Sequence, residues 1–154
     1  MGRLDDRVAI VTGASWGIGA AVAEAFAREG ASVVVNTLPD DQMDMYASEV
    51  VERITAAGGS AIKVPADISV PADVEAMVAS ARDAFGDVDT LVANAAQSQR
   101  APWTEITIDQ WDRTMAVNLR GTFLCAQAVH PGMLRRAGGS IITLTSVTVE
   151  LGMA

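Results

Sequence analysis

A glycine-rich turn near the N-terminus, residues 12–19 (Thr-Gly-Ala-Ser-Trp-Gly-Ile-Gly), constrains the fold of this chain more than any other feature. The apolar run 8–11 before it is short and continuous, as in a strand that is covered on both faces. Residues 20–28 after it carry apolar side chains at helical spacing, and Ile18, Val22 and Phe26 are expected on one helix face. The segment therefore predicts a buried strand that turns directly into a helix.

The three glycines of this turn, Gly13, Gly17 and Gly19, have the spacing Gly-x-x-x-Gly-x-Gly. Because glycine has no Cβ atom, the backbone N–H groups of the turn can close on a ligand, and the positive end of the helix dipole lies there too. The turn is therefore predicted to bind a pyrophosphate. The alternative is a tight strand-to-helix turn with no ligand, since glycine-rich motifs also occur in that role.

Strand-like and helix-like segments alternate along the rest of the chain. Apolar or β-branched runs predict further strands at 32–36, 60–65, 88–93 and 140–145. Helices are expected between them: one from the loop 37–41 to Ala57, one from Pro71 to about Phe85, and a long one from Ile108 towards Gly138. This alternation predicts an α/β fold with a doubly wound parallel sheet of about five strands.

Four residues are expected to mark helix ends. Gly30 is predicted to stop the first helix as a C-terminal cap. Ser69 is a plausible N-cap for the helix at Pro71. Thr107 and Gln110 have the spacing of a capping box, which predicts the start of the long helix.

Composition excludes several classes of function. The chain has 154 residues, half of them hydrophobic, so one domain covering 1–154 with a single core is expected. Its net charge of -8 argues against a nucleic-acid or anionic membrane partner. Cys125 is the single cysteine, so no internal disulfide is expected; it is predicted to be a small buried hydrophobe, and a cytoplasmic location follows. The N-terminus has neither a signal peptide nor a membrane span.

Five features resemble, in this order, the short-chain dehydrogenase/reductase family: the motif TGxxxGxG at 12–19, Asp67, the sequence 94–96 (Asn-Ala-Ala), Asn118 and Ser146. The resemblance covers the chain from Arg7 to its last residue. It implies a Rossmann-type NAD(P)-binding domain and an oxidoreductase that acts on a small alcohol or carbonyl compound. The glycine spacing does not fit the Gly-x-x-Gly-x-x-Gly of epimerases and dehydratases on the related extended fold.

The resemblance also implies a set of cofactor contacts. Asp67 would meet the adenine amino group, beside the backbone of Ile68, while 94–96 would pack against the nucleotide and stabilise the sheet. This last segment departs from the family's usual Asn-Asn-Ala-Gly, because Ala93 and Ala96 stand at its ends. The predicted cofactor-binding residues are Gly13, Ser15, Trp16, Gly17, Ile18, Gly19, Asn36, Thr37, Asp67, Ile68, Asn94, Ala95 and Ala96, and no metal site is predicted.

The end of the second strand bears on the choice of nucleotide. A carboxylate there usually holds the ribose of NAD, whereas the 2′-phosphate of NADP repels it. Thr37 stands where NAD-preferring members of the family have aspartate, and Trp16 stands where NADP-preferring members often have a basic residue. Since no acid is present, NADP is favoured weakly over NAD.

Two catalytic residues can be carried over from the resemblance. Asn118 matches the family asparagine that completes a water relay, and Ser146 matches the serine that hydrogen-bonds the substrate oxygen; Thr145 is a less favoured alternative. Asn118 lies among apolar residues in the long helix, which suggests a local break with its carbonyl or amide engaged elsewhere. The family's Tyr-x-x-x-Lys would lie past Ala154, and neither Tyr46 nor Lys63 has the required spacing.

These 154 residues are therefore expected to be inactive alone and to be a fragment of a longer enzyme, a gene-model artefact, or a truncated form completed by a partner. Ending at Ala154 would leave Ile141, Ile142 and Leu144 on an open sheet edge. A homo-oligomer is expected for the complete protein. The alternative function is a catalytically silent dinucleotide-binding or oligomerisation module.

Overall fold

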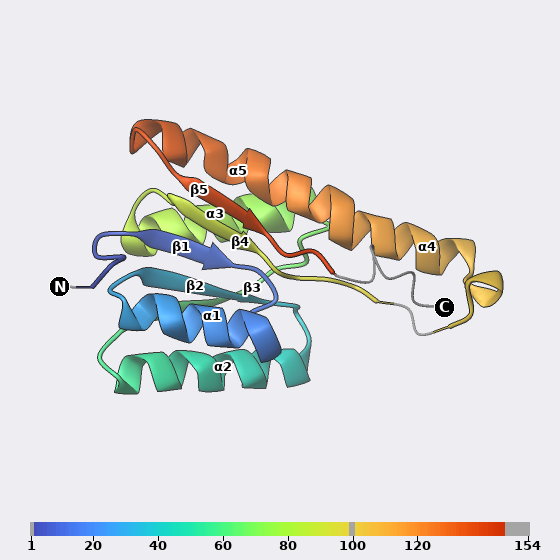
Figure 1. Cartoon of the computed structure of the whole chain (residues 1–154), viewed down its shortest axis with the longest axis horizontal. Helices are drawn as coiled ribbons and strands as arrows, with labels where there is room; N and C mark the ends of the chain where they lie inside the picture. The colour runs from blue at the N-terminus through green and yellow to red at the C-terminus, as the bar shows by residue number, and fades with distance from the viewer. Residues whose placement is uncertain (1, 99–100, 147–154) are drawn as a thin grey trace.

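The computed structural model describes residues 2–98 and 101–146. It has three layers, with a parallel sheet between two layers of helices (Figure 1). All neighbouring strands are parallel and follow the order β3-β2-β1-β4-β5, which confirms the predicted doubly wound α/β fold. The strands are β1 (Val8–Val11), β2 (Ser32–Thr37), β3 (Ser60–Pro65), β4 (Thr90–Ala93) and β5 (Ser140–Thr143).

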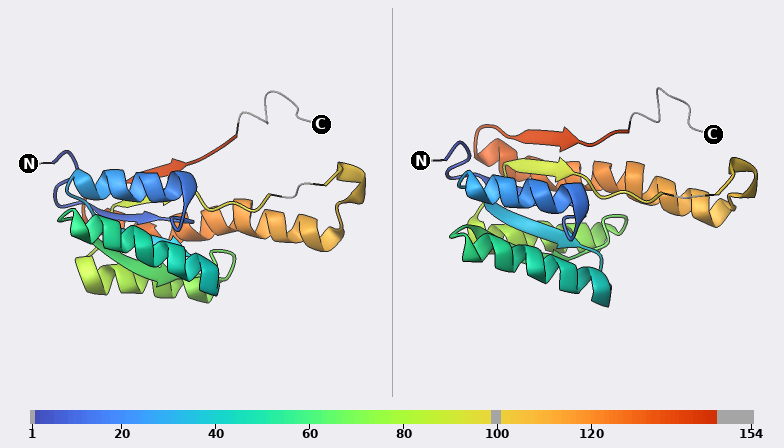
Figure 2. Two further views of the ribbon diagram at one scale, coloured as in Figure 1. Left: turned by 90° about the horizontal axis from the view of Figure 1, so that it is seen from below. Right: turned by 60° about the horizontal axis from the view of Figure 1, so that its bottom comes forward.

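Helices cover both faces of this sheet. On one face lie α1 (Gly17–Arg28) and α2 (Asp41–Ala56), and on the other lie α3 (Pro71–Phe85) and α5 (Thr122–Arg135). α5 forms one long rod with α4 (Ile108–Met115) and the π-helical turn η2 (Ala116–Gly121), and its α4 end extends past the sheet (Figure 2). A short 3₁₀ helix, η1 (Trp103–Glu105), precedes this rod.

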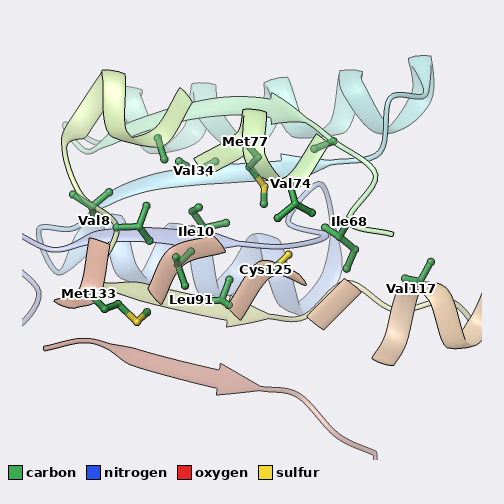
Figure 3. Close-up of a cluster of buried hydrophobic side chains, with 14 residues drawn as sticks. Val8, Ile10, Val34, Ile68, Val74, Met77, Leu91, Val117, Cys125 and Met133 are labelled. Carbon is green, nitrogen blue, oxygen red and sulfur yellow. The ribbon is translucent and has the colours of Figure 1, made fainter. Parts of the chain in front are cut away.

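The strands divide their side chains between two apolar clusters, as the alternation of a strand requires. Val8, Ile10 and Val34 point to the cluster beneath α3 and α5, which Figure 3 shows in close-up. Val33 and Val35 point to the cluster beneath α1 and α2. Both faces of β1 and β2 are buried, so these strands consist of continuous apolar runs.

Cys125 of α5 belongs to the first cluster, and its side chain is completely buried. Burial raises the pKa of its thiol to about 12. The thiol is therefore protonated at neutral pH, and the prediction of a small buried hydrophobe is confirmed.

The predicted buried face of the first helix is wrong in part. Ile18 is 65% exposed, because it lies in the first turn of α1 at the edge of the sheet. The helix instead places small residues against the sheet, which lets its backbone approach closely: Gly19, Ala20, Ala23 and Ala27 are buried. Val22 and Phe26 are only partly buried against this cluster.

Other element ends differ from the sequence-based expectations by a few residues. Val70, not Ser69, is the N-cap of α3; the Ser69 hydroxyl donates instead to Asp67 Oδ1 at 2.7 Å. β4 begins at Thr90 rather than residue 88, and β5 ends at Thr143 rather than 145. The Thr107–Gln110 capping box is confirmed.

β5 is an edge strand of the described sheet and pairs there with β4 alone. Its Ile141 and Ile142 are exposed, as is Leu144 just beyond it, in agreement with the open edge expected from the sequence. Within the described residues, no helix combines the length and apolar character needed to cross a membrane.

Candidate nucleotide-binding site

The candidate site lies where the strand order of the sheet reverses. β1 pairs with β2 on one side and β4 on the other, so the loops that follow these strands diverge from this point. Open α/β sheets bind ligands in the crevice outside the carboxyl ends of such strands. A cavity of about 420 Å³ lies there, and all the predicted cofactor-binding residues except Gly19 and Thr37 line it.

The glycines of the turn have distinct structural roles. Gly17 has φ +61°, and a Cβ atom added to it would meet nothing within 4 Å. Gly13 combines φ +60° with a close approach, since an added Cβ would lie 2.8 Å from the Cα of Ala95. Gly19 packs most tightly, because an added Cβ would lie 2.5 Å from the Gly13 carbonyl oxygen. Gly17 therefore keeps cavity space open, while Gly13 and Gly19 allow the surrounding backbones to pack.

The first turn of α1 offers main-chain donors to this space. A helix leaves its first amides without intrahelical acceptors, which here are those of Gly17, Ile18 and Gly19. The N-cap residue Trp16 makes no side-chain capping hydrogen bond, and the first turn carries no acidic residue. α2 differs, because the Asp40 carboxylate caps it by accepting from two amides. The start of α1 is therefore suited to an anionic ligand.

Asn94 fixes the turn from the end of β4. Its Nδ2 donates to the main-chain oxygens of Thr12 at 2.9 Å and Gly13 at 3.0 Å. In return, the buried Thr12 hydroxyl accepts from the amides of Asn94 and Ala95, both at 3.0 Å. The side chain of Asn94 thus holds the turn against the β4 loop, and both segments line the cavity.

Asn36 fixes the same turn from the end of β2. Its Oδ1 accepts from the Gly13 amide at 3.2 Å, and its main-chain oxygen accepts from Ala14 at 2.8 Å. The Nδ2 group donates to carbonyls of the β3 end, including that of Ala66 at 3.1 Å. Asn36 therefore connects three of the loops around the cavity.

Thr37 does not reach the cavity. Its side chain is 1% exposed, and its hydroxyl has no hydrogen-bond partner among the described residues. The neighbouring Leu38 lines the cavity in its place, together with Met43 of α2. The strand continues one residue further than the predicted end at Asn36, which buries Thr37 opposite Pro65.

Asp67 lies in the loop after β3 with both carboxylate oxygens engaged. Oδ1 accepts from the amide and hydroxyl of Ser69 at 2.9 and 2.7 Å, and Oδ2 lies 2.9 Å from Nη1 of Arg113. Partial burial alone would raise the pKa of this carboxyl, but the Ser69 hydrogen bonds and the Arg113 guanidinium together outweigh it and lower the pKa below its usual value. Asp67 is therefore ionised at neutral pH and acts as an acceptor in the cavity wall.

Asn118 lies in the π-helical turn η2 within the long rod. Its Oδ1 accepts from the Gln97 amide at 2.7 Å, and its Nδ2 donates to the Gln97 carbonyl at 2.9 Å. The local break in the helix and the engaged amide are both confirmed. Isolated π turns within α-helices frequently lie at functional sites.

The other residues considered for catalysis lie outside the cavity lining. Ser146 is the last described residue; it is exposed and follows β5 at the carboxyl edge of the sheet. Tyr46 accepts a hydrogen bond from Gln42 on α2, and Lys63 binds Asp44 and Ser48, so both serve local contacts. Across residues 2–98 and 101–146, no group of three or more His, Cys, Asp or Glu side chains could hold a metal ion.

The sequence analysis missed several residues that line the cavity: Leu38, Met43, Ala66, Gln97, Arg113 and Val117. Leu38, Ala66 and Gln97 directly adjoin predicted residues, so their position next to a strand end was a usable signal. Arg113 had no such signal, because it reaches the cavity from α4, and only the fold brings it to Asp67.

Comparison with known proteins agrees with this site. The sequence model of the family described as short chain dehydrogenase matches residues 7–154. A short-chain dehydrogenase/reductase of Hericium erinaceus is 46% identical over 127 residues, which are 82% of this chain and 50% of that protein. A D-threitol dehydrogenase of Mycolicibacterium smegmatis is 40% identical over 98% of this chain and 56% of that protein. A 3-oxoacyl-[acyl-carrier-protein] reductase of Synechocystis sp. is 39% identical over 99% of this chain and 60% of that protein.

The chain thus spans between half and three fifths of the length of these curated relatives. The family match nevertheless covers nearly all of its sequence, including the glycine turn, Asp67, Asn94, Asn118 and Ser146. Together with the five-stranded parallel sheet and the cavity at its switch point, this match shows that the chain belongs to the short-chain dehydrogenase/reductase family.

Proposed function

We propose that the cavity binds a nicotinamide dinucleotide and that the protein is an NAD(P)-dependent oxidoreductase acting on a small alcohol or carbonyl compound. One observation carries the nucleotide site: Gly17, with positive φ and open space at its missing Cβ, lines the cavity in the uncapped first turn of α1. A pyrophosphate fits this combination of space, amide donors and helix dipole.

The remaining cavity residues fit the other parts of a dinucleotide. The ionised Asp67 would accept a hydrogen bond from the adenine amino group, and Ile68 and the 94–96 segment would pack along the nucleotide. Asn36 and Asn94 would hold the walls in place through the main-chain bonds that each makes. When bound, the nicotinamide supplies or accepts the hydride, and the protein orients it and excludes water.

We propose NADP(H) as the preferred nucleotide. Among the described residues that line the cavity, Asp67 is the only carboxylate, and it is paired with Arg113. The end of β2 presents Asn36 and Leu38 to the cavity, so no acid there repels a 2′-phosphate. The neutral Trp16 offers no cation to attract one, which agrees with a modest rather than an absolute preference.

We also propose catalytic roles for Asn118 and Ser146, from the family resemblance. Ser146 would hydrogen-bond the substrate oxygen, and Asn118 would position the loop at Gln97 and support the water relay. Since Tyr46 and Lys63 are the only residues of their types and both lie outside the cavity lining, we propose that these 154 residues alone do not turn over substrate.

Homo-oligomerisation is also proposed for the complete protein. Trp111, Met115, Leu119 and Phe123 recur every four residues along the long rod and are all exposed. An apolar stripe of this kind supports a protein–protein contact. A cytoplasmic location without a nucleic-acid or membrane partner remains a prediction from the single cysteine and the net charge of -8.

Titration of the chain with NADPH and then NADH, followed by nucleotide fluorescence, tests the proposal. Saturable binding by a monodisperse, folded chain is expected, with tighter binding of NADPH. Absence of binding to either nucleotide by the folded chain would overturn it. The alternative, a silent nucleotide-binding or oligomerisation module, predicts the same binding, but no carbonyl reduction even in a longer protein that contains a Tyr-x-x-x-Lys motif.

A further inference from the structure

Arg113 is the only cationic residue among the described residues that line the cavity. It extends from α4 to the loop after β3, where Nη1 lies 2.9 Å from Asp67 Oδ2 and donates to Ser69 Oγ at 2.7 Å. The Ser69 hydroxyl in turn donates to Asp67 Oδ1 at 2.7 Å. One guanidinium nitrogen thus contacts the carboxylate both directly and through Ser69.

This arrangement fixes the direction of the carboxylate and leaves it acceptor capacity. An ionised carboxylate has about four lone-pair sites. The described residues use two on Oδ1, through the Ser69 amide and hydroxyl, and one on Oδ2, through Arg113. A site on Oδ2 therefore remains for a donor in the cavity, and the Arg113 contact on that same oxygen sets its orientation.

The backbone of the loop is held independently of Arg113. The Asp67 amide donates to Asp73 Oδ2 at 2.9 Å, which fixes the loop to the first turn of α3. Nη2 of Arg120 lies 3.5 Å from the Ser69 carbonyl oxygen, which adds a weaker contact from η2. Loss of the Arg113 side chain should therefore release the Asp67 carboxylate while the loop keeps its place.

Building on the proposed nucleotide site, we propose that Arg113 is a positioning residue that aims Asp67 at the exocyclic amino group of the purine and so makes the site selective for a 6-amino purine. A 6-oxo purine presents a carbonyl oxygen at the same position, and two acceptors facing each other repel. A site built to accept from an N–H group discriminates against an analogue that lacks it.

The test compares the dissociation constants of NADPH and of its hypoxanthine analogue, deamino-NADPH. The parent chain is expected to bind NADPH about tenfold or more tightly than the analogue, as for one hydrogen bond to a charged acceptor. In Arg113→Met the preference should fall at least threefold, chiefly through weaker NADPH binding. Arg113→Lys, which keeps a cation, should retain part of it and serves in its place if the Met variant does not fold.

A matched control is available at the other end of the molecule. Arg135 pairs with Asp87 at 2.6 Å, on the surface and away from the cavity lining. Arg135→Met should leave the purine preference unchanged. Asp67→Ala should abolish the preference, and adding Arg113→Met to it should change nothing more, because Arg113 acts through that carboxylate.

The outcomes separate this inference from the proposed function. An unchanged purine preference in a folded Arg113→Met chain, or equal weakening of both nucleotides, would overturn the role of Arg113 and leave the nucleotide site intact. If the folded parent chain binds neither nucleotide, the proposed function fails and takes this inference with it.

Discussion

The side chain of Asn118 forms a two-way clasp on the backbone of Gln97. Its Oδ1 accepts from the Gln97 amide at 2.7 Å and its Nδ2 donates to the Gln97 carbonyl at 2.9 Å. Gln97 lines the cavity, whereas Asn118 belongs to η2 in the long rod. The clasp thus connects the loop after β4 to the rod, next to the cavity.

Replacing Asn118 by alanine should remove both hydrogen bonds. Because the pair is exposed, water replaces part of the loss, and the free energy of unfolding should fall by about 1 kcal/mol. Asn118→Asp should be at least as damaging, since a carboxylate oxygen would then face the Gln97 carbonyl. Chemical denaturation measures both variants, and parental stability in both would contradict the clasp.

Gly19→Ala should destabilise the chain through crowding. The added Cβ would lie 2.5 Å from the Gly13 carbonyl oxygen and 2.6 Å from Asn94 Nδ2. These atoms belong to the network that holds the turn, so they cannot move without breaking it, and a loss of about 1–3 kcal/mol is expected. Thermal unfolding without nucleotide measures this loss, and a variant with the parental melting temperature would contradict the described packing.

Much of the fold could be predicted from the sequence because local patterns and long-range packing agree here. Short continuous apolar runs such as 8–11 fit only strands buried on both faces. The Thr107–Gln110 capping box is a local signal that tertiary structure has no reason to override. The glycine turn indicated the cavity because its spacing and its position after a strand are both visible in the sequence.

The parts that could not be predicted depend on distances between elements. Helical periodicity placed Ile18 inside, but periodicity does not reveal that α1 approaches the sheet through its small residues. The family position of Thr37 did not show that its side chain is buried opposite Pro65. Arg113 was missed because its contact with Asp67 depends on how α4 crosses the β3 loop.

Asp67 should make stability depend on pH in a defined direction. Its pKa in the folded chain is lowered from 3.8, so the folded state favours the ionised form. The resulting stabilisation is fully present above the unfolded pKa and is lost as the pH falls through the folded pKa. Asp67→Asn should therefore show a shallower loss of stability on acidification below pH 3.8 than the parent chain. Urea denaturation over this pH range measures it, and identical pH profiles would contradict the assigned pKa direction.

The most direct test of the nucleotide site compares Gly17→Ala with Gly58→Ala. Both glycines have positive φ, +61° and +84°, and at both an added Cβ meets nothing within 4 Å. Each alanine should therefore cost a similar amount of stability, about 1–2 kcal/mol for the left-handed conformation. Only Gly17 lines the cavity, whereas Gly58 follows α2 at the opposite end of the sheet.

NADPH titration of the two variants, followed by nucleotide fluorescence, is the deciding measurement. The site predicts that Gly17→Ala loses affinity by about tenfold or more, because the methyl group occupies space beside the amides that would bind the pyrophosphate. Gly58→Ala should bind NADPH as the parent does. Equal affinities for the parent and both variants would contradict a nucleotide seated on the glycine turn.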